Sequence, residues 1–207
     1  MEIELSFVIP VYNSATTIGQ VVADIVAAYA DLQFEVVLVN DGSPDDETEE
    51  VCCELVEKYQ QVHFLQLSKN FSEHNAVLAG MNHTRGEYVA VLDDDGQNPP
   101  SEIGRMLKVL KQNNFDVVYG RYVDKQHHWL RNLGSVFNDK VANFMLGKPP
   151  GLYLSSFKVM NRFLVEQIIS YKGGFPYIDG LVLRATSNIG QIEVSHLARE
   201  SGRSNYT

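Results

Sequence analysis

Apolar residues along the first 120 positions alternate between short continuous runs and runs with helical spacing. The continuous runs, rich in Val, Ile and Leu, are typical of strands buried on both faces of a parallel sheet. They cover residues 5–12, 34–40, 62–67, 87–93 and 116–120. Between them the apolar positions recur at i, i+3 and i+4 or follow prolines and acidic residues, which predicts helices. These helices are expected over 16–29, soon after 41–46, over 74–83 and over 99–112.

This alternation predicts an α/β fold: one domain built on a doubly wound, mostly parallel sheet flanked by helices. The pattern loosens after Gly120. Helices are expected over 127–146 and 161–171, and short strands over 155–160 and 191–197.

The charge is divided unevenly along the chain. The 207 residues carry a net charge of −9. Residues 1–100 hold 3 basic and 18 acidic side chains, whereas residues 101–207 hold 14 basic and 8 acidic ones. An acidic chain argues against general nucleic-acid binding, and the basic second half suggests an anionic partner.

Composition narrows the class of protein further. With 44% hydrophobic and 21% charged residues the chain fits a globular protein and not a disordered one. No apolar run approaches the ~18 residues that a membrane helix needs. The only two cysteines, Cys52 and Cys53, are adjacent, which favours a reducing compartment over a disulfide scaffold.

The chemistry is expected where the strands end, because open α/β sheets bind ligands outside the carboxyl ends of their strands. The strongest signal there is DDDGQNPP at 93–100. If the strand geometry continues, Asp93 and Asp95 point the same way and Asp94 the opposite way. Asp95 and Gln97 can then offer oxygens to one Mg²⁺ or Mn²⁺, an ion that combines one or two carboxylates with substrate phosphates.

Weaker signals have two interpretations each. Asp41, in NDGS, fits a turn or helix cap as well as a ligand contact. Arg121 follows the fifth strand at the same edge, which favours a functional role over a surface charge. Arg131 fits a solvated helix face as well as a substrate contact.

Several enzyme classes lose support because their motifs are missing. The sequence has no GxGxxG after the first strand, no GxxxxGK[ST] and no GxSxG. Dinucleotide-binding proteins, phosphate-loop NTPases and α/β-hydrolases are therefore not favoured. A nucleotidyltransferase ranks low as well, since PVYNSATT after the first strand has no basic residue.

Six motifs in register give a family resemblance over essentially the whole chain. They are FVIPVYN, VNDGS, LSKNFSEHNAVLAGMNHTRGEYVAVLDDDGQNPP, VVYGRY, LSSFKVMNR and R-x-x-G-x-S at 199–204. The sequence resembles the family 2 inverting glycosyltransferases with a GT-A fold. Within that family it is most similar to the polyisoprenyl-phosphate glycosyltransferases, the group that includes dolichyl-phosphate mannose synthase.

The resemblance implies a site for a nucleotide sugar, UDP- or GDP-linked, and a metal. It assigns the nucleotide pocket to Pro10, Tyr12, Asn13, Val39 and Asp41. Asp93 and Asp94 would contact the ribose and phosphates, and Asp95 and Gln97 would ligate Mg²⁺ or Mn²⁺. The family usually has Glu where this sequence has Ser14.

The resemblance also implies an acceptor side. Arg121 and Arg199 would bind pyrophosphate or acceptor phosphate. Arg131 would lie on the acceptor side and, with Asp93 and Asp95, would be a catalytic residue. The last motif usually ends in Ser-Lys; here Asn205 replaces the Lys, and Arg203 is a substitute charge.

Three functions remain open at this stage. The first is transfer of a sugar to a polyprenyl phosphate, a nucleophile that is already anionic and needs arginines rather than a base. The second is transfer to a glycan hydroxyl, for which Asp179 is the candidate base, although a turn or helix-cap role is favoured for it. The third is a nucleotide-sugar-binding module without activity.

The expected organisation is a single catalytic domain with two halves. Residues 1–122 would form the nucleotide-sugar and metal half, and 123–207 the acceptor half. Relatives continue past the R-x-x-G-x-S motif, so we expect a longer protein that acts at the cytoplasmic side of a membrane, where the basic half meets anionic lipid.

Overall fold

The computed structural model describes residues 2–44, 47–122 and 148–197. The strands are β1 (Leu5–Val11), β2 (Phe34–Asn40), β3 (Val62–Gln66), β4 (Tyr88–Val91), β5 (Val117–Tyr122), β6 (Lys158–Asn161) and β7 (Ile189–Val194). The helices are α1 (Ile18–Ala28), α2 (Thr48–Lys58), α3 (Glu73–Met81), α4 (Ser101–Asn113), α6 (Arg162–Ile169) and α7 (Ile178–Ala185). The predicted alternation of strands and helices is confirmed for the first five strands.

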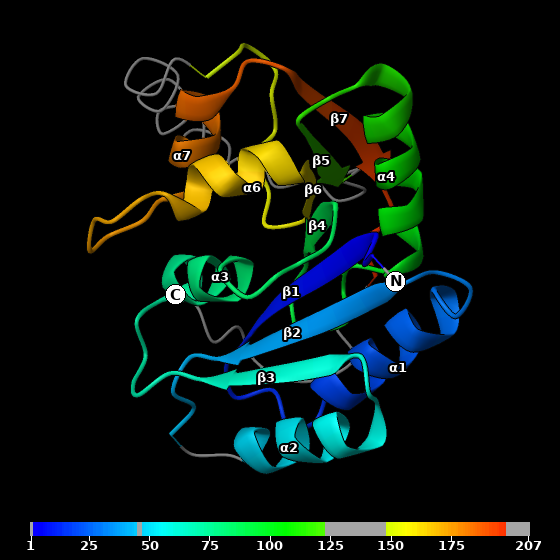
Figure 1. The fold of residues 1–207 in the computed structure, drawn as a ribbon, viewed down its shortest axis with the longest axis vertical. Helices are drawn as coiled ribbons and strands as arrows, with labels where there is room; N and C mark the ends of the chain where they lie inside the picture. Colours follow the sequence, from blue (N-terminus) through cyan, green and yellow to red (C-terminus); the bar gives the residue numbers. More distant parts are fainter. Residues whose placement is uncertain (1, 45–46, 123–147, 198–207) are drawn as a thin grey trace, which may run out of the picture.

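The strands form one sheet of seven in the order β3-β2-β1-β4-β6-β5-β7 (Figure 1). β1 pairs in parallel with β2 on one side and with β4 on the other. The chain therefore reverses its winding direction beside β1, and such a switch point is where open α/β sheets bind ligands.

The helices cover both faces of the sheet, as the doubly wound prediction requires. One apolar core joins alternate residues of β1 to α1 and α4, with Phe7, Ile25 and Met106 among its fully buried members. The opposite core joins the sheet to α3, α6 and α7, with Val8 and Val182 fully buried there. Within the described ranges, no helix is long and apolar enough to cross a bilayer.

Two features of the second half differ from the sequence expectation. β6 is antiparallel to both of its neighbours, β4 and β5, so the sheet is mixed at that point. α7 was not predicted: its N-cap, Tyr177, makes no side-chain cap bond, and Gly180 interrupts its propensity. The helix depends on tertiary packing, because Ile178 and Val182 bury one face of it. The helix expected over 127–146 lies outside the described residues.

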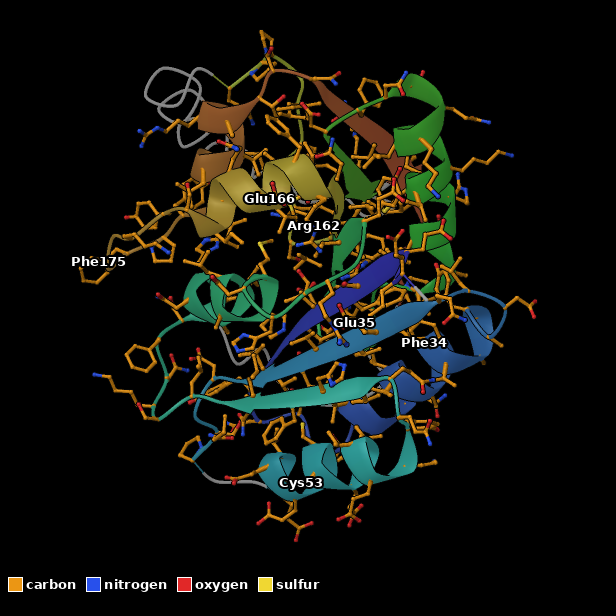
Figure 2. All side chains as sticks on the ribbon, in the orientation of Figure 1. Phe34, Glu35, Cys53, Arg162, Glu166 and Phe175 are labelled. Atoms are coloured by element: carbon orange, nitrogen blue, oxygen red, sulfur yellow. The ribbon has the colours of Figure 1, made fainter. Side chains whose placement is uncertain are left out.

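A buried carboxylate ties the strands together at their amino ends. Glu35 accepts hydrogen bonds from the Ser6 hydroxyl at 2.7 Å and from the Arg85 guanidinium at 2.7 and 3.0 Å. Burial raises the pKa of Glu35, but the hydrogen bonds outweigh burial, so the net shift is downward. This cluster lies at the opposite edge from the carboxyl ends of β1 and β2 (Figure 2).

Candidate functional site

The loops that follow β1 and β4 are joined by one carboxylate. Asp94 accepts a hydrogen bond from the backbone N–H of Tyr12 at 2.9 Å and another from the Ser14 hydroxyl. The Ser14 hydroxyl thus binds the loop after β4 rather than the start of α1, which has no side-chain N-cap bond. The structure therefore brings Tyr12 and Asp94 together at the carboxyl ends of the strands, where the sequence predicted a ligand site.

Asp41 and Asn13 present unsatisfied oxygens at the ends of β2 and β1. Asp41 is fully buried, and its Oδ1 accepts a hydrogen bond from the N–H of Phe71 at 2.7 Å. Its Oδ2 is buried without a hydrogen-bond partner, and so is Oδ1 of Asn13. Burial raises the pKa of Asp41. Because buried polar atoms are nearly always paired, these two acceptors mark a place at the carboxyl ends of β1 and β2 where a bound group or water can donate hydrogen bonds.

The turn after β2 requires glycine. Gly42 has φ +66°, and a Cβ there would lie 2.4 Å from the backbone carbon of Lys69. Ser43 follows; its hydroxyl accepts a hydrogen bond from the N–H of Asn13 at 2.9 Å and donates one to Asn40 at 2.6 Å. This turn fixes Asp41 against the loops that follow β1 and β3.

Pro10 and Val39 lie opposite each other in the β1–β2 register and are both buried. The Val39 side chain packs in a small core with Val37 and Ala76, under α3. Any nucleotide contact at Val39 therefore involves its backbone and not its side chain.

The acidic segment is a turn and not an extended strand. β4 ends at Val91, and the chain turns at Asp94 and Asp95, so the expected continuation of strand geometry is wrong. Asp93 accepts hydrogen bonds from the Asn98 amide at 2.8 Å and the Ser156 hydroxyl at 2.9 Å. The three carboxylates are thus oriented by separate partners rather than by strand alternation.

Two of these carboxylates, Asp93 and Asp94, resist ionisation. Burial, together with the charges of Asp93 and Asp95, raises the pKa of Asp94 to about 6, although hydrogen bonds from Ser14 and Tyr12 lower it. Burial also raises the pKa of Asp93. A cation at this turn would stabilise the ionised forms that the protein alone disfavours.

The donor set at Asp95 and Gln97 fits a hard divalent cation. The Gln97 backbone N–H donates to Asp95 Oδ1 at 3.0 Å, and the Gln97 side-chain nitrogen donates to the Leu197 carbonyl at 3.2 Å. The second bond is made by the amide nitrogen of Gln97, so the amide oxygen takes no part in it. In the part of the chain that the structure describes, no three His, Cys, Asp or Glu residues cluster as a complete metal site. An ion here would complete its coordination with water and substrate phosphates.

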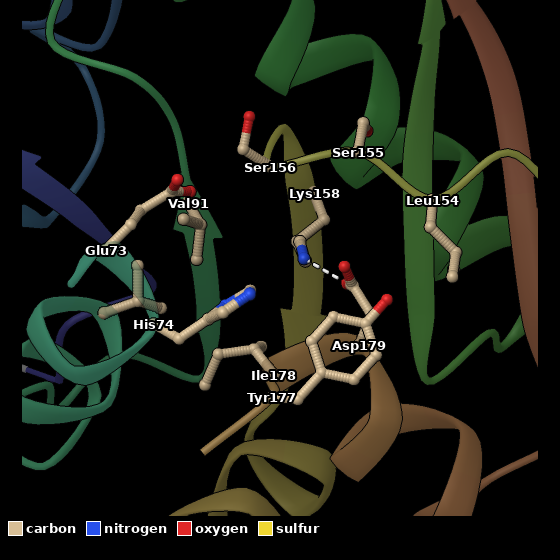
Figure 3. A pocket seen from close by; sticks show the side chains of 11 residues that line it. Glu73, His74, Val91, Leu154, Ser155, Ser156, Lys158, Tyr177, Ile178 and Asp179 are labelled. Carbon is tan, nitrogen blue, oxygen red and sulfur yellow. Dashed lines mark hydrogen bonds and ion pairs between the residues drawn. The ribbon is translucent and has the colours of Figure 1, made fainter. Parts of the chain in front are cut away.

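A pocket of about 310 Å³ opens beside this turn (Figure 3). Its walls include Glu73 and His74 at the start of α3, Ser156 and Lys158 near β6, and Asp179 in α7. Lys158 forms an ion pair with Asp179, and Tyr119 donates a hydrogen bond to the same carboxylate at 2.9 Å. The Asp179 carboxylate is therefore buried and already engaged by two groups.

Glu73 is the acid in this pocket that the sequence reasoning missed. Burial and, after it, the nearby charge of Asp93 raise the pKa of Glu73 to about 7. Burial lowers the pKa of the adjacent His74, whose ring lies 5.2 Å from that of Tyr177. The available signal was an acid in the first turn of the helix after the third strand.

The predicted arginines are only partly placed. Arg121 is exposed where β5 ends, next to Tyr122, whose ring lies 4.4 Å from that of His196. Arg131, Arg199 and Arg203 lie outside the described residues. The structure thus brings the predicted donor-side residues to one edge and leaves the arginine roles as predictions.

Comparison with known proteins decides the family. The model of the family described as "Glycosyl transferase family 2" matches residues 6–169. The chain belongs to glycosyl transferase family 2. Among its curated relatives is an undecaprenyl-phosphate 4-deoxy-4-formamido-L-arabinose transferase of Serratia proteamaculans, 31% identical over 206 residues. The aligned part is 99% of this chain and 63% of that protein. The enzyme of the same name from Edwardsiella ictaluri is also 31% identical, over 98% of this chain and 62% of its own length.

Solved structures agree with a GT-A fold for this family 2 chain. Glucosyl-3-phosphoglycerate synthase from Mycobacterium tuberculosis, in complex with Mn²⁺, UDP-glucose and phosphoglyceric acid, superposes with a TM-score of 0.67 at 18% identity. The match covers 98% of this chain and 73% of that one. S. aureus TarS 1–349 in complex with UDP gives a TM-score of 0.63 at 18% identity, over 94% and 59% of the two chains.

Proposed function

We propose that this chain transfers a sugar, with inversion, from a nucleoside diphosphate donor to a polyprenyl phosphate. One observation carries the proposal: relatives named as undecaprenyl-phosphate sugar transferases align over 99% of the chain. The chain spans about 63% of the length of that relative, and the activity proposed is that of the whole protein.

The donor is proposed to lie across the carboxyl ends of β1, β2 and β4. The unpaired Oδ2 of Asp41 fits an N–H of a pyrimidine or purine base. Tyr12 and Asn13 border the same space from the end of β1. Solved structures of this fold hold UDP or UDP-glucose, which supports a nucleotide donor for this chain.

Mg²⁺ or Mn²⁺ is proposed at Asp95 and Gln97. A divalent cation supplies charge neutralisation for the departing diphosphate. Asp93 and Asp94 are held in place by Ser156, Asn98, Tyr12 and Ser14, so they form the rigid side of this site. A structural relative contains Mn²⁺ together with UDP-glucose, which supports the choice of ion.

The acceptor phosphate is proposed to act without a general base. Its oxygen attacks the anomeric carbon as the bond from that carbon to the diphosphate oxygen breaks, in one in-line step. The engagement of Asp179 Oδ1 by both Lys158 and Tyr119 supports this proposal, because it gives that carboxylate a packing role in the pocket wall. Arg121, Arg131, Arg199 and Arg203 remain the proposed phosphate ligands.

The test is direct product formation. The protein is incubated with labelled UDP-, GDP-, CDP- or dTDP-sugars, Mn²⁺ and undecaprenyl or dolichyl phosphate. We expect an acid-labile, lipid-extractable product with one nucleotide class. Asp95→Asn should reduce turnover at least tenfold, whereas Asp31→Asn, an exposed control between α1 and β2, should not. Absence of product with every donor and both lipids would refute the proposal.

One observation favours transfer to a glycan hydroxyl as the second candidate. Glu73 lines the pocket, and its pKa of about 7 suits a general base near neutral pH. Replacing Glu73 with Gln separates the two candidates. In this variant, turnover with a hydroxyl acceptor should fall by 10²-fold or more. Turnover with a phosphate acceptor should stay within several-fold of the parent.

A further inference from the structure

The loop between α6 and α7 carries an unusually exposed aromatic side chain. Phe175 is 93% exposed, more than any other large apolar side chain in the described ranges. It lies at the tip of a loop that projects away from the body of the molecule (Figure 2). Burying a Phe side chain is favourable, so a surface that faces only water gains nothing by presenting one in this way.

The loop has a defined shape that presents this side chain outward. The Tyr171 hydroxyl donates to the Phe175 carbonyl at 3.3 Å, and the Lys172 ammonium donates to the Ile169 carbonyl at 3.3 Å. A Cβ on Gly173 would lie 2.1 Å from the Tyr171 hydroxyl oxygen, so the ring packs directly over that glycine. Pro176 follows the tip and fixes its own φ. The exposure of Phe175 thus results from a folded turn.

A basic hollow lies at the base of the same loop. It has a volume of about 470 Å³, and its lining includes Lys172 and Arg184 together with Ser170 and Tyr171. Among the residues that the structure describes, no acidic side chain lines it. Two cations and a hydroxyl suit a phosphate group, because ammonium and guanidinium groups make their strongest hydrogen bonds to charged oxygens.

The loop also adjoins the candidate active-site pocket. Tyr177, two residues after Phe175, lines that pocket with Ile178 and Asp179. The loop segment therefore runs from the basic hollow, past the exposed Phe, to the pocket wall. One loop therefore carries both the exposed Phe175 and a wall residue of the pocket, Tyr177.

We infer that residues 171–177 form a docking loop for an anionic phospholipid bilayer. Phe175 enters the boundary between headgroups and acyl chains, and Lys172 and Arg184 bind lipid phosphate. An aromatic tip flanked by basic residues matches this interface in both polarity and charge. The role of the loop in delivering acceptor rests on the proposed polyprenyl phosphate substrate; the binding of lipid does not.

Vesicle sedimentation tests the inference. The probes are vesicles of phosphatidylcholine alone and vesicles with 30% phosphatidylglycerol, chosen as an anionic bilayer. We expect binding to the anionic vesicles, reduced about tenfold by Phe175→Ser. Lys172→Gln with Arg184→Gln should reduce it by about fivefold per charge, since each basic residue near such a surface contributes about 1 kcal/mol.

Matched controls make the result specific. Phe163→Ser removes another exposed Phe, 54% exposed on α6, and Lys58→Gln with Lys108→Gln removes two exposed charges on α2 and α4. Both controls should bind vesicles as the parent does. Equal loss in the loop variants and their controls would overturn the inference, as would equal binding to both kinds of vesicle. So would a fall in oligomeric state of Phe175→Ser with unchanged vesicle binding, which would assign the loop to a second copy of the chain.

A kinetic readout separates this inference from the proposed function. With acceptor embedded in anionic vesicles, Phe175→Ser should raise the KM for acceptor about tenfold. With the same acceptor in neutral detergent, its kcat and KM should equal those of the parent. Vesicle binding without any lipid-linked product would support the docking loop and refute the proposed acceptor. Product formation, together with vesicle binding that Phe175→Ser leaves unchanged, would support the proposed acceptor and refute the docking loop.

Discussion

Asp41 combines a satisfied oxygen with an unsatisfied one, and the difference predicts a selective mutation. In Asp41→Asn, the amide oxygen still accepts the Phe71 N–H bond, while the amide nitrogen replaces Oδ2 and faces a base N–H with another donor. We expect UDP or GDP affinity to fall about 10- to 100-fold, because an unmatched buried polar group costs about 1–3 kcal/mol.

Isothermal titration with the nucleotide that the parent binds, in Mn²⁺, provides the measurement. Asp31→Asn is the matched control, since Asp31 is exposed. Unchanged affinity in a folded Asp41→Asn protein would remove Asp41 from the nucleotide site.

Glu73 predicts a pH dependence of stability in metal-free protein. Burial, and then the charge of Asp93, raise its pKa to about 7 from an unfolded value near 4.5. The folded state therefore binds the proton more tightly. The contribution of Glu73 to stability is complete below pH 4.5 and is lost as the pH rises through 7, with a slope of at most about 1.4 kcal/mol per pH unit.

The variant Glu73→Gln lacks this loss. Relative to the parent, it should gain stability between pH 5 and pH 8, by about 1–3 kcal/mol from the same slope. Urea unfolding at both pH values measures the gain. Glu54→Gln on exposed α2 should show no such change. A difference between Glu73→Gln and parent that stays constant with pH would contradict the predicted titration.

Helix α3 is placed by one glycine, and it carries Glu73 and His74 to the pocket. A Cβ on Gly80 would lie 2.5 Å from Val8 Cγ1 in β1 and 3.0 Å from Val39 Cγ2 in β2. The helix therefore approaches the sheet more closely than a side chain allows. Gly80→Ala should lower stability by about 1–3 kcal/mol through overpacking, despite the better helix propensity of Ala.

A second-site change tests that explanation. Val8→Ala removes the methyl group that the new Cβ meets, so Gly80→Ala with Val8→Ala should be more stable than the sum of the two single changes predicts. Thermal or urea unfolding of the four proteins gives the coupling free energy. Strict additivity would place the cost elsewhere than at this contact.

The elements were predictable to the extent that their own residues determine them. Continuous apolar runs located β1 to β5, because those strands lie in a sheet that helices cover on both faces. The i, i+3, i+4 spacing located α1, because that helix buries one face. β6 was expected near 155–160, but its antiparallel place between β4 and β5 depends on pairing between Val159 and both Ala90 and Val118, which are distant in sequence. α7 was missed because Ile178 and Val182 are helical through packing rather than propensity.

The candidate site shows the same division. Asp41, Asp93 and Asp94 were predictable, since residues directly after parallel strands must meet at one edge. The engagement of Asp94 by Ser14, and of Asp179 by Lys158 and Tyr119, was not, because it joins separate segments of the chain. Glu73 was missed because an acidic residue in the first turn of a helix is common and does not by itself indicate a site.

In the whole molecule, the acidic first half and the basic second half meet at the pocket. Glu73 and His74 come from the first half, and Lys158 and Asp179 from the second. The ion pair of Lys158 with Asp179 joins β6 to α7, and the hydrogen bond from Tyr119 to the same carboxylate joins β5 to them. Asp179 therefore neutralises the buried cation of Lys158 within the pocket wall. This is a packing role, distinct from the chemistry proposed for Asp95.

A paired substitution distinguishes packing from catalysis at Asp179. Asp179→Asn alone leaves Lys158 as an uncompensated buried charge, and removing one partner of such a pair costs about 3–5 kcal/mol. In Asp179→Asn with Lys158→Met the cation is gone, and the Asn oxygen still accepts the Tyr119 bond. We therefore expect the double variant to recover most of the stability and to keep turnover with polyprenyl phosphate within about tenfold of the parent. A double variant that refolds to parental stability and yet loses turnover by 10²-fold or more would instead identify Asp179 as the base for a hydroxyl acceptor.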